Sequence, residues 1–134
     1  MNYEKVSVNV EDKLLAQIDL LIADGFYANR SDFINQGIKS QISKEAKNID
    51  SLINLHAKEN EVDENQWFIG VANFDKEFLE EVQLQKKKIT INGFGVLSFS
   101  SGCSDQLIFA TVKSISKRIK IHANKNVIEH YKNS

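Results

Sequence analysis

The sequence predicts an α+β protein in two parts, and three patterns indicate this fold class. Residues Lys5 to Val10 alternate polar side chains with valine, which is the period of a half-buried strand. Two stretches after this strand carry leucine and isoleucine at helical spacing. The second half mixes apolar runs of strand length with a further helical pattern, so we expect a small α/β sandwich-like unit with a mainly antiparallel sheet.

The first strand has two chemically different faces. Its apolar face consists of three valines, and its polar face carries a cation, a hydroxyl and an amide, namely Lys5, Ser7 and Asn9. A single strand near a chain terminus is not stable by itself. We therefore expect this strand to pair with the same strand of a second copy.

Two helices are expected next. The first helix should run from about Glu11 to Asp24, and Gly25 stands where a left-handed terminating residue is common. Asn29 is the expected N-cap of the second helix, and Asp32 follows at the spacing of a capping box. The apolar pattern then continues to about Leu55, which indicates either one long helix or two helices with a break near Ser43.

The second half predicts several short elements after an acidic, polar boundary at Lys58 to Gln66. Trp67 to Ala72 is typical of a strand, and Asp75 to Lys86 is typical of a helix. Asn92-Gly93 is a strong signal for a tight turn between strands. Leu107 to Val112 and Ile115 to Ile121 are two further strand candidates, although 105–115 also fits a helix. A short helix is expected near the end at 126–131.

The order of elements in residues 4–44 resembles the ribbon-helix-helix (Arc/MetJ/CopG-type) DNA-binding regulators, including those of the nickel-responsive type. The resemblance is carried by Lys5-Val-Ser-Val-Asn-Val10, by Leu14-Leu15-x-x-Ile18-Asp19, and by the stretch from Gly25 to Ile34. It does not extend to a nickel-binding domain, because His56, His122, His130 and Cys103 are scattered and lack ligand spacing.

The resemblance implies an intertwined dimer whose two strands form an antiparallel ribbon in the major groove of double-stranded DNA. Lys5, Ser7 and Asn9 would then face base edges. Asn29, Arg30 and Ser31 would contact the phosphate backbone at a helix N-terminus. Each residue also has a purely structural interpretation. Lys5, Ser7 and Asn9 could form an ordinary solvated strand face. Asn29 could be only a helix cap, and Arg30 could be an ordinary surface arginine.

These interpretations give three predicted segments. They are a ribbon-helix-helix domain at 1–45, a helical linker at 46–62, and an α+β oligomerisation or effector-sensing domain at 63–134. The predicted function is a sequence-specific transcriptional regulator, a repressor, acting as a dimer or tetramer. The alternative is an antitoxin or plasmid-partition protein whose second domain binds another protein. The sequence leaves open whether a small-molecule or protein effector acts on it.

Composition and charge limit the kinds of function and cellular setting that we expect for this chain. The net charge is −1, and residues 1–59 hold 7 Lys and Arg against 9 Asp and Glu, so DNA binding would depend on a local patch. One cysteine and no apolar run of membrane-spanning length favour a reducing, cytoplasmic setting without membrane contact. We expect no metal, no cofactor and no enzymatic activity, because no nucleophile–base or metal-ligand spacing stands out.

Overall fold

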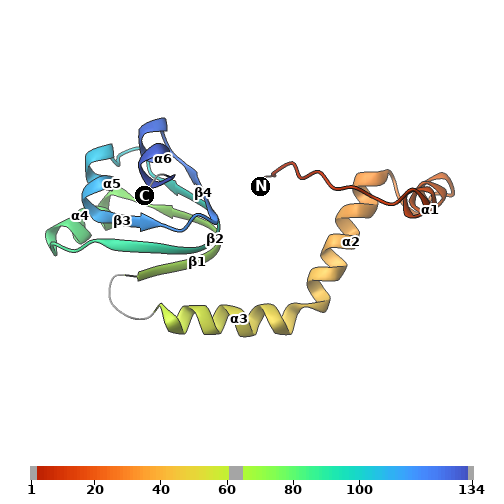
Figure 1. Ribbon diagram of the computed structural model, residues 1–134, viewed down its shortest axis with the longest axis horizontal. Helices are drawn as coiled ribbons and strands as arrows, with labels where there is room; N and C mark the ends of the chain where they lie inside the picture. Colours follow the sequence, from red (N-terminus) through yellow and green to blue (C-terminus); the bar gives the residue numbers. More distant parts are fainter. Residues whose placement is uncertain (1–2, 61–64, 133–134) are drawn as a thin grey trace. The chain divides into compact units, whose positions relative to one another are not determined.

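The computed structural model describes residues 3–60 and 65–132 (Figure 1). It contains two compact units, one formed by the residues up to Ile49 and one formed by the residues from Asp50 onward. Of the predicted boundary at Lys58 to Gln66, residues 61–64 lie outside the described part.

The N-terminal unit holds an unpaired segment and two complete helices. Helix α1 spans Asp12–Ala23 and helix α2 spans Arg30–Lys44, close to the expected bounds. Helix α3, Ala46–Glu59, follows after the single residue Glu45. The second of the two predicted alternatives, a pair of helices with a break near Ser43, is therefore confirmed.

The segment before α1 does not form the predicted strand in the single chain. Residues 3–11 have neither helix nor strand pairing. The physical reason is that a strand is defined by hydrogen bonds to a neighbouring strand, and no described segment of the same chain offers one here. The predicted strand would therefore form only by pairing with the same segment of a second copy.

The second unit is built on a parallel sheet. Strand β1, Asn65–Phe74, pairs in parallel with β2, Ile89–Phe99, after the crossover helix α4, Lys76–Leu84. The remaining elements are α5, Asp105–Thr111; β3, Val112–Ile115; β4, Ile119–His122; and α6, Lys125–Lys132. Strand β2 also pairs in parallel with β3 and β4 along its other edge.

The predicted antiparallel sheet is therefore wrong, and Asn92-Gly93 explains the error. These two residues lie inside β2 and make no turn. Gly93 has φ +134°, and a Cβ added there would lie 1.8 Å from the carbonyl oxygen of Phe68 on β1. The glycine serves close approach of two strands, a use that sequence alone does not distinguish from a turn.

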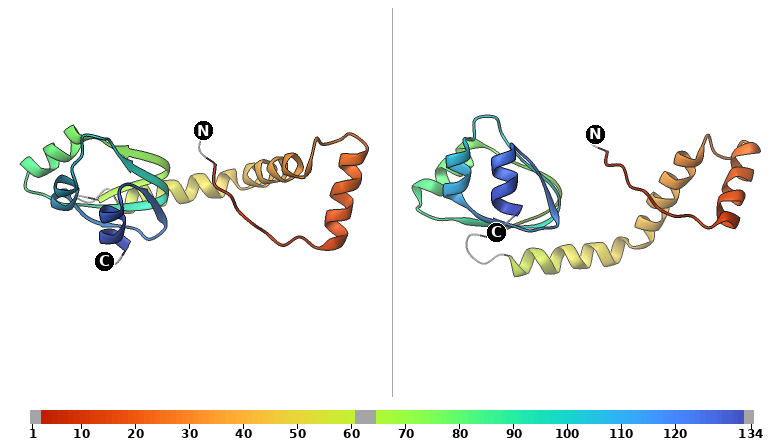
Figure 2. Two further views of the ribbon diagram at one scale, coloured as in Figure 1. Left: turned by 90° about the horizontal axis from the view of Figure 1, so that it is seen from above. Right: turned by 45° about the horizontal axis from the view of Figure 1, so that its top comes forward.

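Helices α4, α5 and α6 cover one face of the sheet (Figure 1, Figure 2). Right-handed crossovers between successive parallel strands added in one direction place α4 and α5 on the same side. Helix α6, which follows β4, packs into the same core. Alternate β2 residues point into the core that these helices complete. The buried apolar core contains Leu79, Val82, Ile89, Ile91, Leu97, Leu107, Ile108, Val112, Ile115, Ile119, Val127 and Tyr131.

The opposite face of the sheet receives the C-terminal end of α3. The imidazole of His56 stacks on Trp67, with ring centroids 5.7 Å apart and planes at 14°. The Asn92 side-chain amide donates to the Asn60 side-chain oxygen at 3.1 Å. Further along β1, Ile69 and Val71 are 52% and 69% exposed, so much of this face stays open.

We predict that Gly93→Ala severely destabilises the second unit. The added methyl group has no room beside the backbone of Phe68, and overpacking of this kind costs about 3 kcal/mol or more. Thermal unfolding followed by near-UV circular dichroism of Trp67 would show a large drop in Tm. Gly102→Ala is the matched control, since its Cβ would meet only the flexible Lys76 side chain at 3.3 Å. Equal Tm values for the two variants would contradict this account.

Candidate nucleic-acid interface

The segment from Lys5 to Val10 is exposed on both of its faces. The three polar side chains that would face DNA bases, Lys5, Ser7 and Asn9, are all exposed. Val6 and Val8 are also exposed, at 77% and 67% of their full surface. An isolated exposed valine is ordinary, but alternating exposed valines next to other apolar side chains form a surface suited to burial.

Helix α1 adds to this apolar surface. A hollow of about 520 Å³ lies beside Val10 and α1, and the Phe33 ring contributes to its wall. Within the described residues up to Ile49, only Ile18 is buried, at 8% exposure. Exposed apolar residues around it include Leu14, Leu20, Ile34, Ile38 and Ile42. The single N-terminal unit therefore exposes the apolar side chains that would ordinarily form its core.

The turn between α1 and α2 has a fixed geometry. The N–H of Phe26 donates to the Leu21 carbonyl at 2.9 Å, and the N–H of Gly25 donates to the Ile22 carbonyl at 3.1 Å. This pair of bonds, with φ +86° at Gly25, is a Schellman motif. The predicted role of Gly25 as the helix-terminating residue is confirmed.

Asn29 caps α2 as predicted. Its side-chain oxygen accepts a hydrogen bond from the backbone N–H of Asp32 at 2.7 Å. The Asp32 carboxylate accepts in return from the N–H of Ala28 at 3.0 Å and from the Gln36 side chain at 3.0 Å. These donors, the Ala28 N–H first, lower the pKa of Asp32 below its usual range. The start of α2 is thus fixed by a reciprocal network.

The structure gives Arg30 a partner that the sequence analysis did not foresee. Its guanidinium makes a bidentate ion pair with Asp19 of α1, with Nε–Oδ1 at 2.9 Å and Nη2–Oδ2 at 2.8 Å. Hydrogen bonding and the opposite charge lower the pKa of Asp19 and raise that of Arg30. The pair is exposed, at 56% and 47%, and it joins the two helices. The predicted phosphate contact by Arg30 stays a prediction, and a phosphate would compete with the Asp19 carboxylate for the guanidinium.

Two backbone groups at the same helix end are available to an anion. In the part of the chain that the structure describes, the N–H groups of Arg30 and Ser31 donate to no protein acceptor. The N-terminus of a helix carries partial positive charge, so these donors suit a phosphate oxygen. This site needs no arginine side chain, and the Asn29 cap holds it in place.

His130 and Cys103 of the second unit have ordinary packing roles, whereas His122 is exposed. The imidazole of His130 lies 4.4 Å from the ring of Phe109, centroid to centroid. The Cys103 thiol lies 3.7 Å from the carbonyl oxygen of Phe74, and burial raises its pKa. Across residues 3–60 and 65–132, no three His, Cys, Asp or Glu side chains gather in a way that could hold a metal ion.

Two features of the second unit escaped the sequence analysis. One is the contact of α3 with the sheet, where Trp67, Phe94 and Arg118 line a polar hollow of about 370 Å³. There the Arg118 guanidinium lies 5.2 Å from the centroid of the Phe94 ring. The other is an apolar hollow beside α6. The sequence gives no signal for either, because both form only when separate strands and helices meet.

None of the described helices combines the length and the hydrophobicity that crossing a membrane requires.

Comparison with known proteins identifies one family. A family model described as the Ribbon-Helix-Helix transcriptional regulator family matches residues 1–128. No curated protein and no solved structure matches the chain. The family match covers both units and includes every residue of the candidate interface.

We predict that Asn29→Ala lowers the free energy of unfolding by about 1 kcal/mol, since the side chain supplies the cap acceptor for α2. Urea denaturation followed by helical circular dichroism measures the change. Asn29→Asp is the matched control, because it keeps an acceptor at the same position. A loss of the same size in both variants would rule out the capping role.

Proposed function

The chain belongs to the ribbon-helix-helix transcriptional regulator family, and we propose on this basis that it is a repressor that binds operator DNA as a dimer. Members of this family are DNA-binding transcription regulators, generally acting as dimers. In our proposal two copies pair residues 5–10 into an antiparallel ribbon that enters the major groove. The protein would act in the cytoplasm, as a dimer or as a tetramer built from two dimers.

The observation that carries the proposal is the exposed valine face. Val6 and Val8 are 77% and 67% exposed, and they belong to a unit in which Ile18 alone of the described residues is buried. Pairing two copies would turn both valine faces toward the apolar surfaces of four helices. At roughly 25 cal/mol per Å² of apolar surface buried, such packing is a strong driving force for association.

The polar face would supply sequence recognition. Each ribbon would present Lys5, Ser7 and Asn9 twice, once from each copy. Lys can donate to guanine O6 and N7, Asn can pair with adenine N6 and N7, and Ser can serve several bases. One lysine in each strand supplies little charge, so specificity would rest mainly on the hydroxyl and the amide.

The start of α2 would hold the DNA backbone. The free N–H groups of Arg30 and Ser31 support a phosphate contact there, and the Ser31 hydroxyl would add a donor. Asp19 engages two of the N–H donors of Arg30 and offsets its charge, so the remaining guanidinium donors would meet a phosphate with a carboxylate close by. We therefore expect Arg30 to position the helix and to contribute less to phosphate binding than its charge suggests.

A second candidate function is that of an antitoxin or partition protein, whose second unit binds another protein. The exposed Ile69 and Val71 on the open sheet face favour this alternative. The folded sheet disfavours it, since a protein-binding tail is often unstructured before it meets its partner. Limited proteolysis of the free full chain separates the two: resistance of residues 65–132 supports the regulator, and rapid cleavage there supports the alternative.

We predict that Asn9→Ala weakens binding to the preferred duplex by about tenfold or more, because one base contact per copy is lost. The preferred duplex would first be selected by the full chain from a random pool, and affinity would then be measured by fluorescence anisotropy. Circular dichroism would be unchanged.

Asn126→Ala, at an exposed asparagine of α6, is the control and should bind as the parent does. The proposal fails if the full chain selects no sequence at low salt, or if the two asparagine variants bind equally well.

A further inference from the structure

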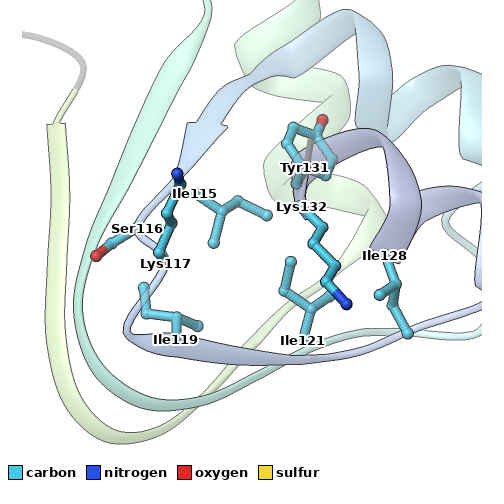
Figure 3. A pocket seen from close by; sticks show the side chains of 8 residues that line it. All are labelled: Ile115, Ser116, Lys117, Ile119, Ile121, Ile128, Tyr131 and Lys132. Carbon is cyan, nitrogen blue, oxygen red and sulfur yellow. The ribbon is translucent and has the colours of Figure 1, made fainter. Parts of the chain in front are cut away.

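A hollow of about 410 Å³ opens between α6 and the edge of the sheet formed by β3 and β4 (Figure 3). This volume lies within the range of small-molecule pockets, roughly 300–1,000 Å³. Four isoleucines supply much of its wall, namely Ile115, Ile119, Ile121 and Ile128. The hollow lies wholly within the second unit and shares no residue with the candidate nucleic-acid interface.

Tyr131 makes the wall more apolar than its residue type suggests. Its hydroxyl is 2.8 Å from the carbonyl oxygen of Val112 and 3.2 Å from that of Ile108, so its polar end is engaged in the core. Burial raises the pKa of Tyr131, which keeps the hydroxyl neutral. The ring is therefore what this residue offers to the hollow, as Figure 3 shows.

Two ammonium groups flank this apolar wall. Lys117 lies beside Ser116 at one end, and Lys132 lies beside Ile121 and Ile128 at the other (Figure 3). Of the residues that the structure describes, none that lines the hollow carries a carboxylate. Among the described residues, neither lysine has an ion-pair partner.

We propose that this hollow binds a carboxylate that carries a short hydrocarbon chain. The chain would cover the isoleucines and the Tyr131 ring, and the carboxylate would accept hydrogen bonds from a lysine ammonium at the mouth. A neutral hydrocarbon would gain nothing from the exposed ammonium groups, and a highly charged anion would gain nothing from the apolar wall. An amine would meet like charge at both ends.

Such a ligand would be the small-molecule effector of the regulator. That role rests on the proposed function, whereas binding itself does not. The hollow is bounded by β3, β4 and α6, the elements that complete one edge of the second unit. A ligand there would stabilise that edge and, through it, any assembly of the second unit.

The test is isothermal titration of the full chain, without DNA, with octanoate, 1-octanol and octylamine. These probes share one hydrocarbon chain and differ in the head group. We expect octanoate to bind about tenfold tighter than 1-octanol, because it gains a charge-assisted hydrogen bond, and octylamine to bind most weakly. Ile128→Gln should weaken binding of both octanoate and octanol.

Single-residue variants show which lysine binds the octanoate carboxylate. Lys132→Gln or Lys117→Gln should remove the preference for octanoate over octanol, and Lys88→Gln, at an exposed lysine outside the hollow, should not. The proposal is overturned if octanoate binds no tighter than octanol, or if the preference survives both lysine changes. Because the titration contains no DNA, failure of octanoate to bind would not contradict the proposal of operator binding. Likewise, the result for Asn9→Ala does not test the proposal of carboxylate binding.

Discussion

The structure depends on an imbalance in the N-terminal unit, which has many apolar side chains and almost no interior of its own. Of its described residues only Ile18 is buried, while Val6, Val8 and Ile38 each keep more than half of their surface exposed. A unit of this size cannot be stable with so little burial. Association of two copies offers the missing core, and the alternation of the strand then fixes which side chains face outward. In the proposed dimer, Lys5, Ser7 and Asn9 would face outward because the valines would be buried.

Local signals made the two helices of the N-terminal unit and their connecting turn predictable from the sequence, whereas the strand at residues 5–10 stays a prediction about two copies. The Gly25 turn, the Asn29 cap and the apolar spacing of both helices depend on residues within a few positions of one another, and the structure confirms them. The Arg30–Asp19 pair was missed because its partners are eleven residues apart on different helices. The pair joins α1 to α2, and the phosphate contact predicted for Arg30 stays a prediction.

The second unit was less predictable because its decisive contacts lie far apart in the sequence. Asn92-Gly93 predicted a turn, but Gly93 allows two parallel strands to approach at Phe68, twenty-five residues earlier in the chain. The direction of strand pairing follows from the crossover helices, which the sequence indicated only in part. The hollow beside α6 and the contact of α3 with Trp67 likewise have no local signature.

The central claim is that residues 5–10 of two copies pair as strands before DNA is bound. Backbone amide hydrogen exchange of the free full chain tests it most directly. Paired strands predict protection at alternate amides of this segment, lost in Val8→Asp and retained in Ser7→Asp, since only the valine faces the helices. Exchange of all these amides at the rate of an unstructured peptide in the parent protein would contradict the account.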